Sequence, residues 1–290
     1  MSDQGTRNLG EQGFVLVWVL GSIMLLAAIL TPFAIFARIH FMLAANVEES
    51  FRFDLLADGF STLALTTLSG RGESGYPLLN GDQQACSIDG YTVLVSLQDH
   101  SGLIDLNGAP PELLALGFQA VGVDAQDVGG LAQTALAFRQ VRSRSERTET
   151  PAVNLKHAPF EAVVELKAFP RLREIPTRTL QDIFTVHARQ GTVSRPLARP
   201  ALHRTLVNHR GGEQLDSDAL FLSGTITARV EIWSSDGKLL GFSERVVSLN
   251  FESGRVAELE RRGRDTGTDR PIARTNLSQC GTLLGISTLG

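Results

Sequence analysis

The sequence predicts an α+β fold: a long N-terminal transmembrane helix, a small antiparallel sheet, and an all-α insertion domain between the strands of that sheet. Three observations predict it. Residues 14–37 are uncharged and mostly apolar. Apolar residues recur at every second position in 91–97 and again in 225–249, as they do on half-buried strands. Between these regions, short apolar clusters at helical spacing are separated by Pro, Gly and Asp.

The apolar run 14–37 is long enough to cross a membrane. A helix of this length, at about 1.5 Å per residue, reaches roughly 36 Å, and the hydrocarbon core is about 30 Å thick. Gly21 and Pro32 fall inside the run, and membrane helices tolerate both residues. The pattern becomes amphipathic after Arg38, so we expect one helix over 14–58 with its transmembrane part at 14–37.

A short polar leader, residues 1–13, precedes this helix and ends at the step Gly13–Phe14. An ordinary secretory signal has its cleavage site after the apolar core, whereas the conspicuous junction here lies before it. We therefore expect the apolar segment to be retained. Positive charges barely discriminate between the two orientations. We place the leader in the cytoplasm and the C-terminal domain in the periplasm, because a short tail needs the least translocation.

The rest of the chain divides into three predicted domains and a tail. The sheet comprises residues 59–98 and 215–254, and the helical insertion comprises 99–214. Within the insertion, Pro110, Pro111 and Glu112 suit the first turn of a helix, and Asp124 suits an N-cap before a helix over 128–141. Further helices are expected at 160–167, 177–187 and 199–207.

The second half of the sheet is predicted to be a hairpin. Its strands alternate on both sides of Asp236-Gly237, which is a strong signal for a tight turn. Residues 255–290 are rich in Arg, Gly, Thr and Asp with little apolar content. We expect this tail to be mostly disordered.

Three features in this order resemble the type IV pilin-like proteins, and among them the K-type minor pseudopilins of type II secretion systems. The first is the leader ending at Gly13–Phe14 before a long apolar helix. The second is the stretch 97–107, Leu-Gln-Asp-His-Ser-Gly-Leu-Ile-Asp-Leu-Asn, which is similar to the family's step from sheet into helical insertion. The third is the closing hairpin at 220–252. The resemblance covers residues 10 to 252.

The resemblance implies a specific processing event. A prepilin peptidase of the inner membrane would cleave between Gly13 and Phe14 and methylate the new amino terminus of Phe14. Most pilin-like proteins carry a Glu five residues into the mature chain, where this sequence has Trp18. K-type pseudopilins characteristically lack that Glu and lie at the tip of the fibre. A carboxylate in an apolar helix is costly unless it is paired.

The same resemblance implies a function and partners. The chain would form the tip of the type II secretion pseudopilus, with the I-type and J-type minor pseudopilins and the major pseudopilin as partners. It would be needed for pseudopilus assembly and protein export across the outer membrane, and its tip would face the secretin or the exported protein. Two alternatives stay open: a minor pilin of a type IV or DNA-uptake pilus, and an unrelated signal-anchored periplasmic protein.

Nucleic-acid binding is a competing interpretation of the insertion. Residues 104–139 also resemble a helix-hairpin-helix module, with a single glycine, Gly122, in the turn. Arg139, Arg142, Arg144 and Arg147 form a basic run that phosphate would attract, although a solvated linker explains it as well. Because the net charge is −4, we expect no nucleic-acid partner.

The sequence gives only weak signals for a cofactor or for catalysis, and we expect no cofactor. Oxygens of Asp99, Asp105, Asn107 and Glu112 could hold calcium, yet turn formation and capping explain these residues equally well. The six histidines form no spaced pair, and no nucleophile motif is present, so we expect no enzyme activity.

Cys86 and Cys280 are the two cysteines of the chain. They do not form a zinc-binding spacing, and in an oxidising compartment they could pair.

Overall fold

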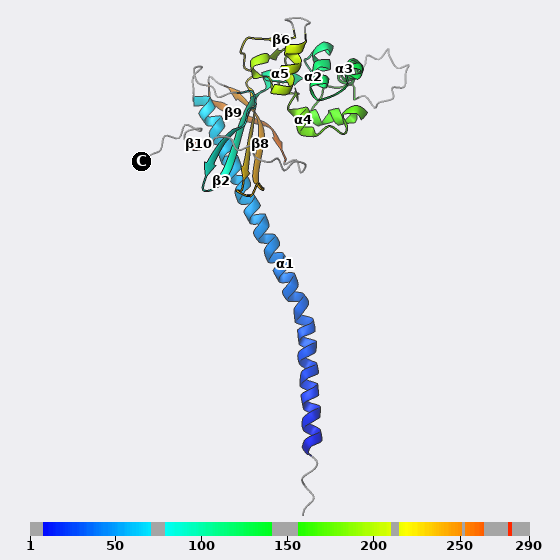
Figure 1. The fold of residues 1–290 in the computed structure, drawn as a ribbon, viewed down its shortest axis with the longest axis vertical. Coiled ribbons are helices and arrows are strands. Elements are labelled where there is room, and N and C mark those ends of the chain that lie inside the picture. Colours follow the sequence, from blue (N-terminus) through cyan, green and yellow to red (C-terminus); the bar gives the residue numbers. More distant parts are fainter. Residues whose placement is uncertain are drawn as a thin grey trace, which may run out of the picture. The chain divides into compact units, whose positions relative to one another are not determined.

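The computed structural model describes residues 8–70, 79–140, 156–209, 215–250, 253–263 and 278–279. The chain divides into two units, Met1–Arg52 and Phe53–Gly290. Helix α1 (Asn8–Gly70) makes up the described part of the first unit and supplies the first element of the second (Figure 1). The predicted helix is therefore present, but the predicted bounds, 14–58, were wrong at both ends.

The second unit is built on a six-stranded sheet. The strands are β1 (Gln84–Ile88), β2 (Tyr91–Asp99), β7 (Thr225–Trp233), β8 (Leu239–Asn250), β9 (Arg255–Arg262) and β10 (Ser278–Gln279). Their order in the sheet is β10-β1-β2-β7-β8-β9. All neighbours are antiparallel except β10, which runs parallel to β1.

The predicted closing hairpin is confirmed. Strands β7 and β8 pair from Thr225↔Ser248 to Trp233↔Leu239, with one register shift between Ile232 and Trp233. In the turn, the backbone N–H of Ser234 donates to the carbonyl of Lys238 at 2.9 Å, and Gly237 has φ +84°. That left-handed conformation favours glycine, which explains the Asp-Gly signal.

The prediction of a disordered tail from residue 255 was wrong for its first part. Residues 255–262 form β9, which pairs with β8 from Asn250↔Arg255 to Glu244↔Arg262. The strand was missed because it lies beside β8 as an outer strand and is mostly exposed. Its sequence, Arg-Val-Ala-Glu-Leu-Glu-Arg-Arg, therefore lacks the apolar alternation of a half-buried strand.

The insertion, defined here as residues 100–224, leaves and re-enters the sheet at adjacent points. Asp99 at the end of β2 pairs with Ile226 near the start of β7. The α-helices of the insertion are α2 (Pro111–Ala120), α3 (Ala125–Arg139), α4 (Thr177–Gln181) and α5 (Pro200–Asn208). Its 3₁₀ turns are η2 (His100–Gly102), η3 (Val163–Ala168), η4 (Pro170–Leu172) and η5 (Arg195–Leu197).

The insertion is not purely helical, so this part of the prediction needs correction. Strand β3 (Ile104–Asp105) pairs in parallel with β4 (Phe184–Thr185), and β5 (Val193–Ser194) pairs with β6 (Asp216–Ser217). The helix expected over 177–187 stops at Gln181 because Phe184 and Thr185 join β3. The helix expected over 160–167 is the 3₁₀ turn η3.

Two apolar clusters hold the second unit together. One lies between the end of α1 and the sheet and includes Phe53, Ala57 and Leu65 from the helix. The other fills the insertion, where Phe138 stacks on Phe160 with ring centroids 4.6 Å apart. Burying a Phe or Leu side chain contributes about 1.5–3 kcal/mol, so each cluster stabilises its own layer. The joint between the layers is largely polar, as described below.

Candidate assembly site

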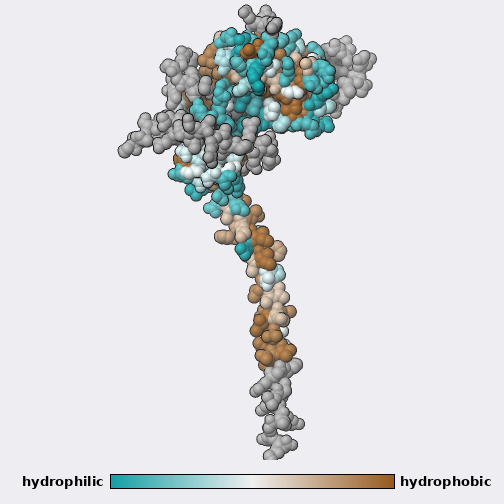
Figure 2. All heavy atoms as spheres, in the orientation of Figure 1, coloured by the Kyte–Doolittle hydropathy of each residue, from teal (hydrophilic) through white to brown (hydrophobic). Residues whose placement is uncertain are grey.

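The helix of the first unit has an apolar surface that is almost entirely exposed. From Val15 to Phe51 every side chain except that of Ser22 is exposed. Figure 2 shows most of this helix in the brown of apolar residues. Among the described residues, Val15–Leu68 is the one segment whose length and hydropathy would allow a membrane span, with a mean hydropathy of 2.3 in its best window. Such a helix needs lipid or other helices around it.

The polar side chains in this surface bond to their own helix. The hydroxyl of Ser22 donates to the carbonyl of Trp18 at 2.9 Å, and that of Thr31 donates to the carbonyl of Ala27 at 2.6 Å. In lipid, polar groups must find partners inside the protein. Both hydroxyls therefore meet the requirement of a membrane segment without a neighbouring chain.

The predicted processing residues lie near the start of α1. Gly13 and Phe14 have helical backbone, and the side chain of Phe14 is outside the described part of the structure. Trp18 lies on the helix surface, 70% exposed, within the uncharged run. The first carboxylate after Phe14 is that of Glu48. Cleavage at Gly13–Phe14 and the role of Trp18 stay predictions.

In the second unit, the end of α1 is fixed to β8 and β9 by polar contacts as well as by the apolar cluster. Asp54 accepts the N–H of Phe242 at 3.0 Å. Asp58 accepts the hydroxyl of Ser243 at 2.5 Å and pairs with Arg261 at 2.8 Å. Burial raises the pKa of Asp58, but these two donors outweigh burial and hold it below its usual value. The carboxylate therefore stays charged between the helix and the sheet.

A buried histidine joins the insertion to the opposite face of the sheet. His100 is fully buried at the point where the chain leaves β2. Its Nδ1 lies 2.7 Å from the hydroxyl of Thr185 in the insertion, and its Nε2 lies 2.7 Å from the hydroxyl of Thr227 on β7. Burial first, and then the charges of Arg262 and His187, hold the pKa of His100 well below its usual value. A neutral ring therefore bridges the two layers.

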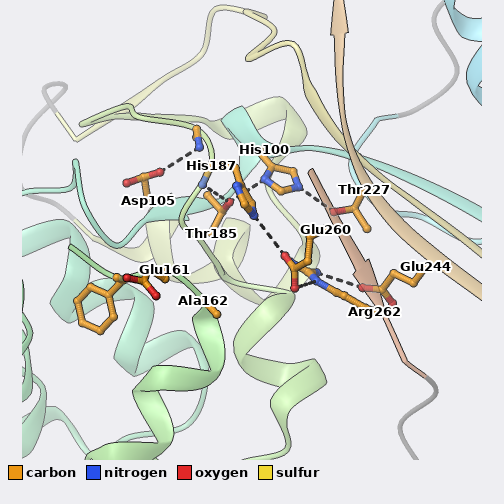
Figure 3. A network of polar contacts seen from close by, with 12 residues as sticks. His100, Asp105, Glu161, Ala162, Thr185, His187, Thr227, Glu244, Glu260 and Arg262 are labelled. Carbon is orange, nitrogen blue, oxygen red and sulfur yellow. Dashed lines mark hydrogen bonds and ion pairs between the residues drawn. The ribbon is translucent and has the colours of Figure 1, made fainter. Parts of the chain in front are cut away.

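A hydrogen bond between two side chains extends this contact to the outer strand (Figure 3). His187 Nε2 lies 3.2 Å from Glu260 Oε2 on β9. The bond from His187, against the opposing effect of burial and together with Arg262, lowers the pKa of Glu260 to about 2. We call His100, Thr185, His187, Thr227 and Glu260 the polar joint. It ties the insertion to β7 and β9 at once.

Beside the polar joint, the sheet buries a layer of paired charges. Arg229 and Glu244 are each 4% exposed and pair directly with each other. Arg262 bonds Glu244 through Nη1 at 3.1 Å, and it also bonds Glu260. Attraction to Arg229 and Arg262 outweighs burial and keeps the pKa of Glu244 low. Paired in this way, buried charges avoid the several kcal/mol that an isolated buried ion costs.

Asp105, one of the residues whose oxygens could hold calcium, bonds to the backbone of its own turn and of the loop at 188–189. Asp105 Oδ1 accepts the N–H groups of Asn107 and Gly108, and Oδ2 accepts those of Ala188 and Arg189, all at 2.8–3.0 Å. These bonds do not test the expectation of no cofactor, with calcium as a possibility, and it stays a prediction.

The other residues whose oxygens could hold calcium also have structural roles. Asp99 Oδ1 accepts the N–H groups of Ser101 and Ser223. Asn107 exchanges hydrogen bonds with the backbone of Phe160, and Glu112 lies in the first turn of α2. In the described part of the chain, no group of three or more His, Cys, Asp or Glu side chains gathers around a point.

The helix-hairpin-helix interpretation is partly reflected in the fold. Helices α2 and α3 form a hairpin, and Gly122 in the turn has φ +96°. Arg139, however, turns inward, donating to the carbonyls of Leu106 and Ala109 at 2.6 and 2.7 Å. The remaining arginines of the basic run, Arg142, Arg144 and Arg147, lie outside the described residues.

Cys86 is fully buried at the centre of β1 and is disulfide-bonded. Its neighbour in the parallel pairing with β10 is Ser278. Cys280 lies outside the described residues, so the pairing of Cys86 with Cys280 stays a prediction.

The polar joint was not predicted from the sequence. His100 belongs to the quoted stretch 97–107, but its partners are 85 and 127 positions away. A histidine directly after a strand, flanked by Asp99 and Ser101, was the one local signal. Nothing in the sequence pattern connects it with Thr185 or Thr227.

Comparisons with known proteins support the fold. No family model matches the chain, and no curated protein matches it. Among solved structures, it is similar to a chain of the GspK–GspI–GspJ complex of the type 2 secretion system of enterotoxigenic Escherichia coli. The match has a TM-score of 0.50 and 11% sequence identity, and it covers 78% of this chain and 100% of that chain. At this identity the likeness concerns the fold, and it confirms the predicted α+β class.

Proposed function

We propose that this protein is a minor pseudopilin that forms the tip of a type II secretion pseudopilus. The observation that supports this most is the fold match across the whole length of a chain from a complex of minor pseudopilins. The exposed apolar helix of the first unit agrees with it. On this proposal the protein acts by assembly rather than catalysis, and pseudopilus assembly and protein export depend on it.

The helix would serve in two successive environments. It first anchors the chain in the inner membrane with the second unit in the periplasm, and it then packs among the helices of the other subunits. The absence of a carboxylate at Trp18 fits a subunit at the tip, because such a subunit has no need of the contact that the usual Glu makes with a neighbouring amino terminus. A neutral helix also avoids the cost of an unpaired charge in lipid.

The insertion would form the outer surface of the tip. The polar joint and the buried charge layer hold it against the sheet, so the end of the fibre would be a firm surface. Its partners would be the I-type and J-type minor pseudopilins and the major pseudopilin. Beyond the tip, the secretin or the exported protein would meet the insertion.

Processing by a prepilin peptidase tests the proposal. The chain is co-expressed with the peptidase, and the mature amino terminus is determined by mass spectrometry. We expect an N-methylated Phe14, and we expect the Gly13→Ala change to block cleavage because the peptidase reads the residue before the cut. A matched Gly21→Ala change, which places its added methyl group in open space, should leave processing intact.

An intact leader in the presence of an active peptidase, or cleavage beyond residue 37, would contradict this proposal. A minor pilin of a type IV or DNA-uptake pilus would be processed in the same way. That alternative predicts different partners, namely other minor pilins in place of the I-type and J-type pseudopilins.

A further inference from the structure

A cavity of about 390 Å³ opens beside the polar joint, on the face of the sheet opposite α1. It lies between α4 and strands β7, β8 and β9. We call it the arginine pocket. Its charged and apolar lining includes Arg178, Arg229, Glu231, Trp233, Leu239, Phe242, Glu244, Glu260, Arg261 and Arg262. A cavity of this size accommodates a side chain or a short peptide segment.

The carboxylates of the arginine pocket already have partners. Glu231 pairs through Oε1 with Arg178 at 3.2 Å, and its Oε2 accepts the indole N–H of Trp233 at 3.2 Å. Glu244 bonds Arg229 through one oxygen and Arg262 through the other. Each oxygen of Glu260 bonds Arg262. No acceptor oxygen on these three side chains lacks a donor.

The guanidinium groups, in contrast, have donors to spare. Among the arginines that line the pocket, Arg178, Arg229 and Arg262 pair with its three glutamates, so these charges balance. The guanidinium of the fourth, Arg261, bonds Asp58 and Glu258 instead. A guanidinium offers five N–H donors. Among the described residues, Arg229 donates through Nε to Glu244, and its Nη1 lies 3.8 Å from Asp182, beyond hydrogen-bond distance. Arg178 reaches Glu231 through Nη2 alone. Because Arg229 is 4% exposed, its remaining donors have little access to bulk water.

One wall of the pocket is apolar. Trp233 and Phe242 lie on neighbouring strands β7 and β8 and face the cavity together with Leu239. A ligand that fits both features has an acidic group on a short apolar stem. We propose that the arginine pocket binds a carboxylate of a peptide segment presented by a partner protein. This goes beyond the proposed function, and it does not depend on processing at Gly13–Phe14.

Tryptophan fluorescence can measure this binding. The chain has two tryptophans, so a Trp18→Phe background leaves Trp233 as the reporter in the pocket wall. The full chain in detergent is titrated with three short peptides that share a Leu-X-Leu centre. The first has Glu at X and an amidated end, the second has Gln and an amidated end, and the third has Gln and a free terminal carboxylate.

We expect saturable quenching or a spectral shift with at least one carboxylate peptide, at about tenfold or greater affinity over the neutral peptide, because charge-assisted hydrogen bonds are strong. Stronger binding of the first peptide assigns the site to an acidic side chain, and stronger binding of the third assigns it to a chain terminus. Added salt should weaken either complex. Equal affinity for all three peptides, or no saturable change at millimolar peptide, would overturn the proposal.

A double change, Arg178→Gln with Glu231→Gln, removes a pocket cation without leaving its partner as an unpaired buried charge. We expect it to weaken carboxylate binding about tenfold. Arg173→Gln is the matched control, since Arg173 is exposed on the same insertion and does not line the pocket. Unchanged binding in the folded double variant would exclude this site. If that variant does not fold, the comparison of the three peptides on the unaltered pocket still tests whether the pocket binds a carboxylate.

Discussion

Asp105 shows what a single residue does in the stretch that resembles the pseudopilin family. It is 1% exposed and accepts four backbone N–H groups, two from its own turn and two from the loop at 188–189. From the sequence, Asp105 could be interpreted either as a turn residue or as one of several oxygens that could hold calcium. Its second pair of donors lies more than 80 positions away, so the connecting role depends on tertiary structure.

Replacing Asp105 by Asn tests this role. The amide offers one acceptor oxygen in place of two, so a donor would face two of the four N–H groups. We expect the second unit to lose about 2–4 kcal/mol of stability, since each buried donor left unsatisfied costs about 1–3 kcal/mol. Denaturant unfolding followed by Trp233 fluorescence in the Trp18→Phe background measures it. Asp124→Asn, at an N-cap without a side-chain bond, should change little, and equal effects of the two changes would contradict the account.

His100 predicts a pH dependence at the same scale. Burial lowers its pKa well below the usual value in the folded state, whereas the unfolded chain takes up a proton near pH 6.5. The unfolded state therefore binds more protons as pH falls, and stability present above about pH 6.5 is lost below it, by up to about 1.4 kcal/mol per pH unit. Glu260 has a pKa of about 2 in the folded state. As the pH falls below about 4.5, its carboxylate begins to protonate in the unfolded chain, and further stability is lost.

The contribution of His100 can be separated from that of Glu260 by measuring the free energy of unfolding between about pH 6.5 and 5, above the range in which the glutamate protonates. His100→Gln should flatten the slope there, because an amide does not titrate, although the variant is less stable throughout. His203 is exposed on α5, and His203→Gln should keep the slope. A slope that persists unchanged in His100→Gln would show that the fold does not depend on a neutral His100.

At the scale of elements, strands and helices with strong local patterns were predicted well. Strands β2, β7 and β8 were expected at 91–97 and within 225–249, and each lies within one or two residues of that expectation. Pro111 begins α2, as expected for a proline in a first turn. Strand β9 and the two short parallel pairs were missed because pairing partners, rather than their own apolar periodicity, determine them.

Glycine at close contacts was another feature that the sequence did not reveal. A Cβ added to Gly241 on β8 would lie 2.4 Å from the carbonyl oxygen of Phe53 in α1. Gly241 thus lets the helix backbone approach the sheet. An added Cβ at Gly129, on the exposed side of α3, meets nothing within 4 Å.

These two positions make a matched pair of alanine changes. Gly241→Ala should force α1 away from β8 and destabilise the second unit by about 1–3 kcal/mol, as overpacking does. Gly129→Ala should stabilise it by about 0.5–1 kcal/mol, because glycine is unfavourable inside a helix. The melting temperature of each variant, measured by thermal unfolding, shows whether the change destabilises or stabilises the protein. A neutral Gly241→Ala would show that the helix and the sheet pack less closely than described.

At the scale of the whole molecule, the two units have different roles in the proposed function. The first unit supplies a mostly apolar helix that is uncharged over residues 14–37. The second unit supplies a sheet and an insertion with cores of their own. The long apolar helix could be predicted because length and hydropathy are local properties. The polar joint and the arginine pocket could not be predicted, because each is assembled from residues that are distant in the sequence.

Complex formation with other minor pseudopilins tests the central claim most directly. The chain is co-expressed with the prepilin peptidase and the I-type and J-type pseudopilins of the same cell, purified in detergent, and weighed by native mass spectrometry. The account predicts a complex containing one copy of each of the three proteins, with Phe14 at the amino terminus of this chain. A processed chain that stays free of both partners, or that joins minor pilins of a type IV pilus in their place, would contradict it.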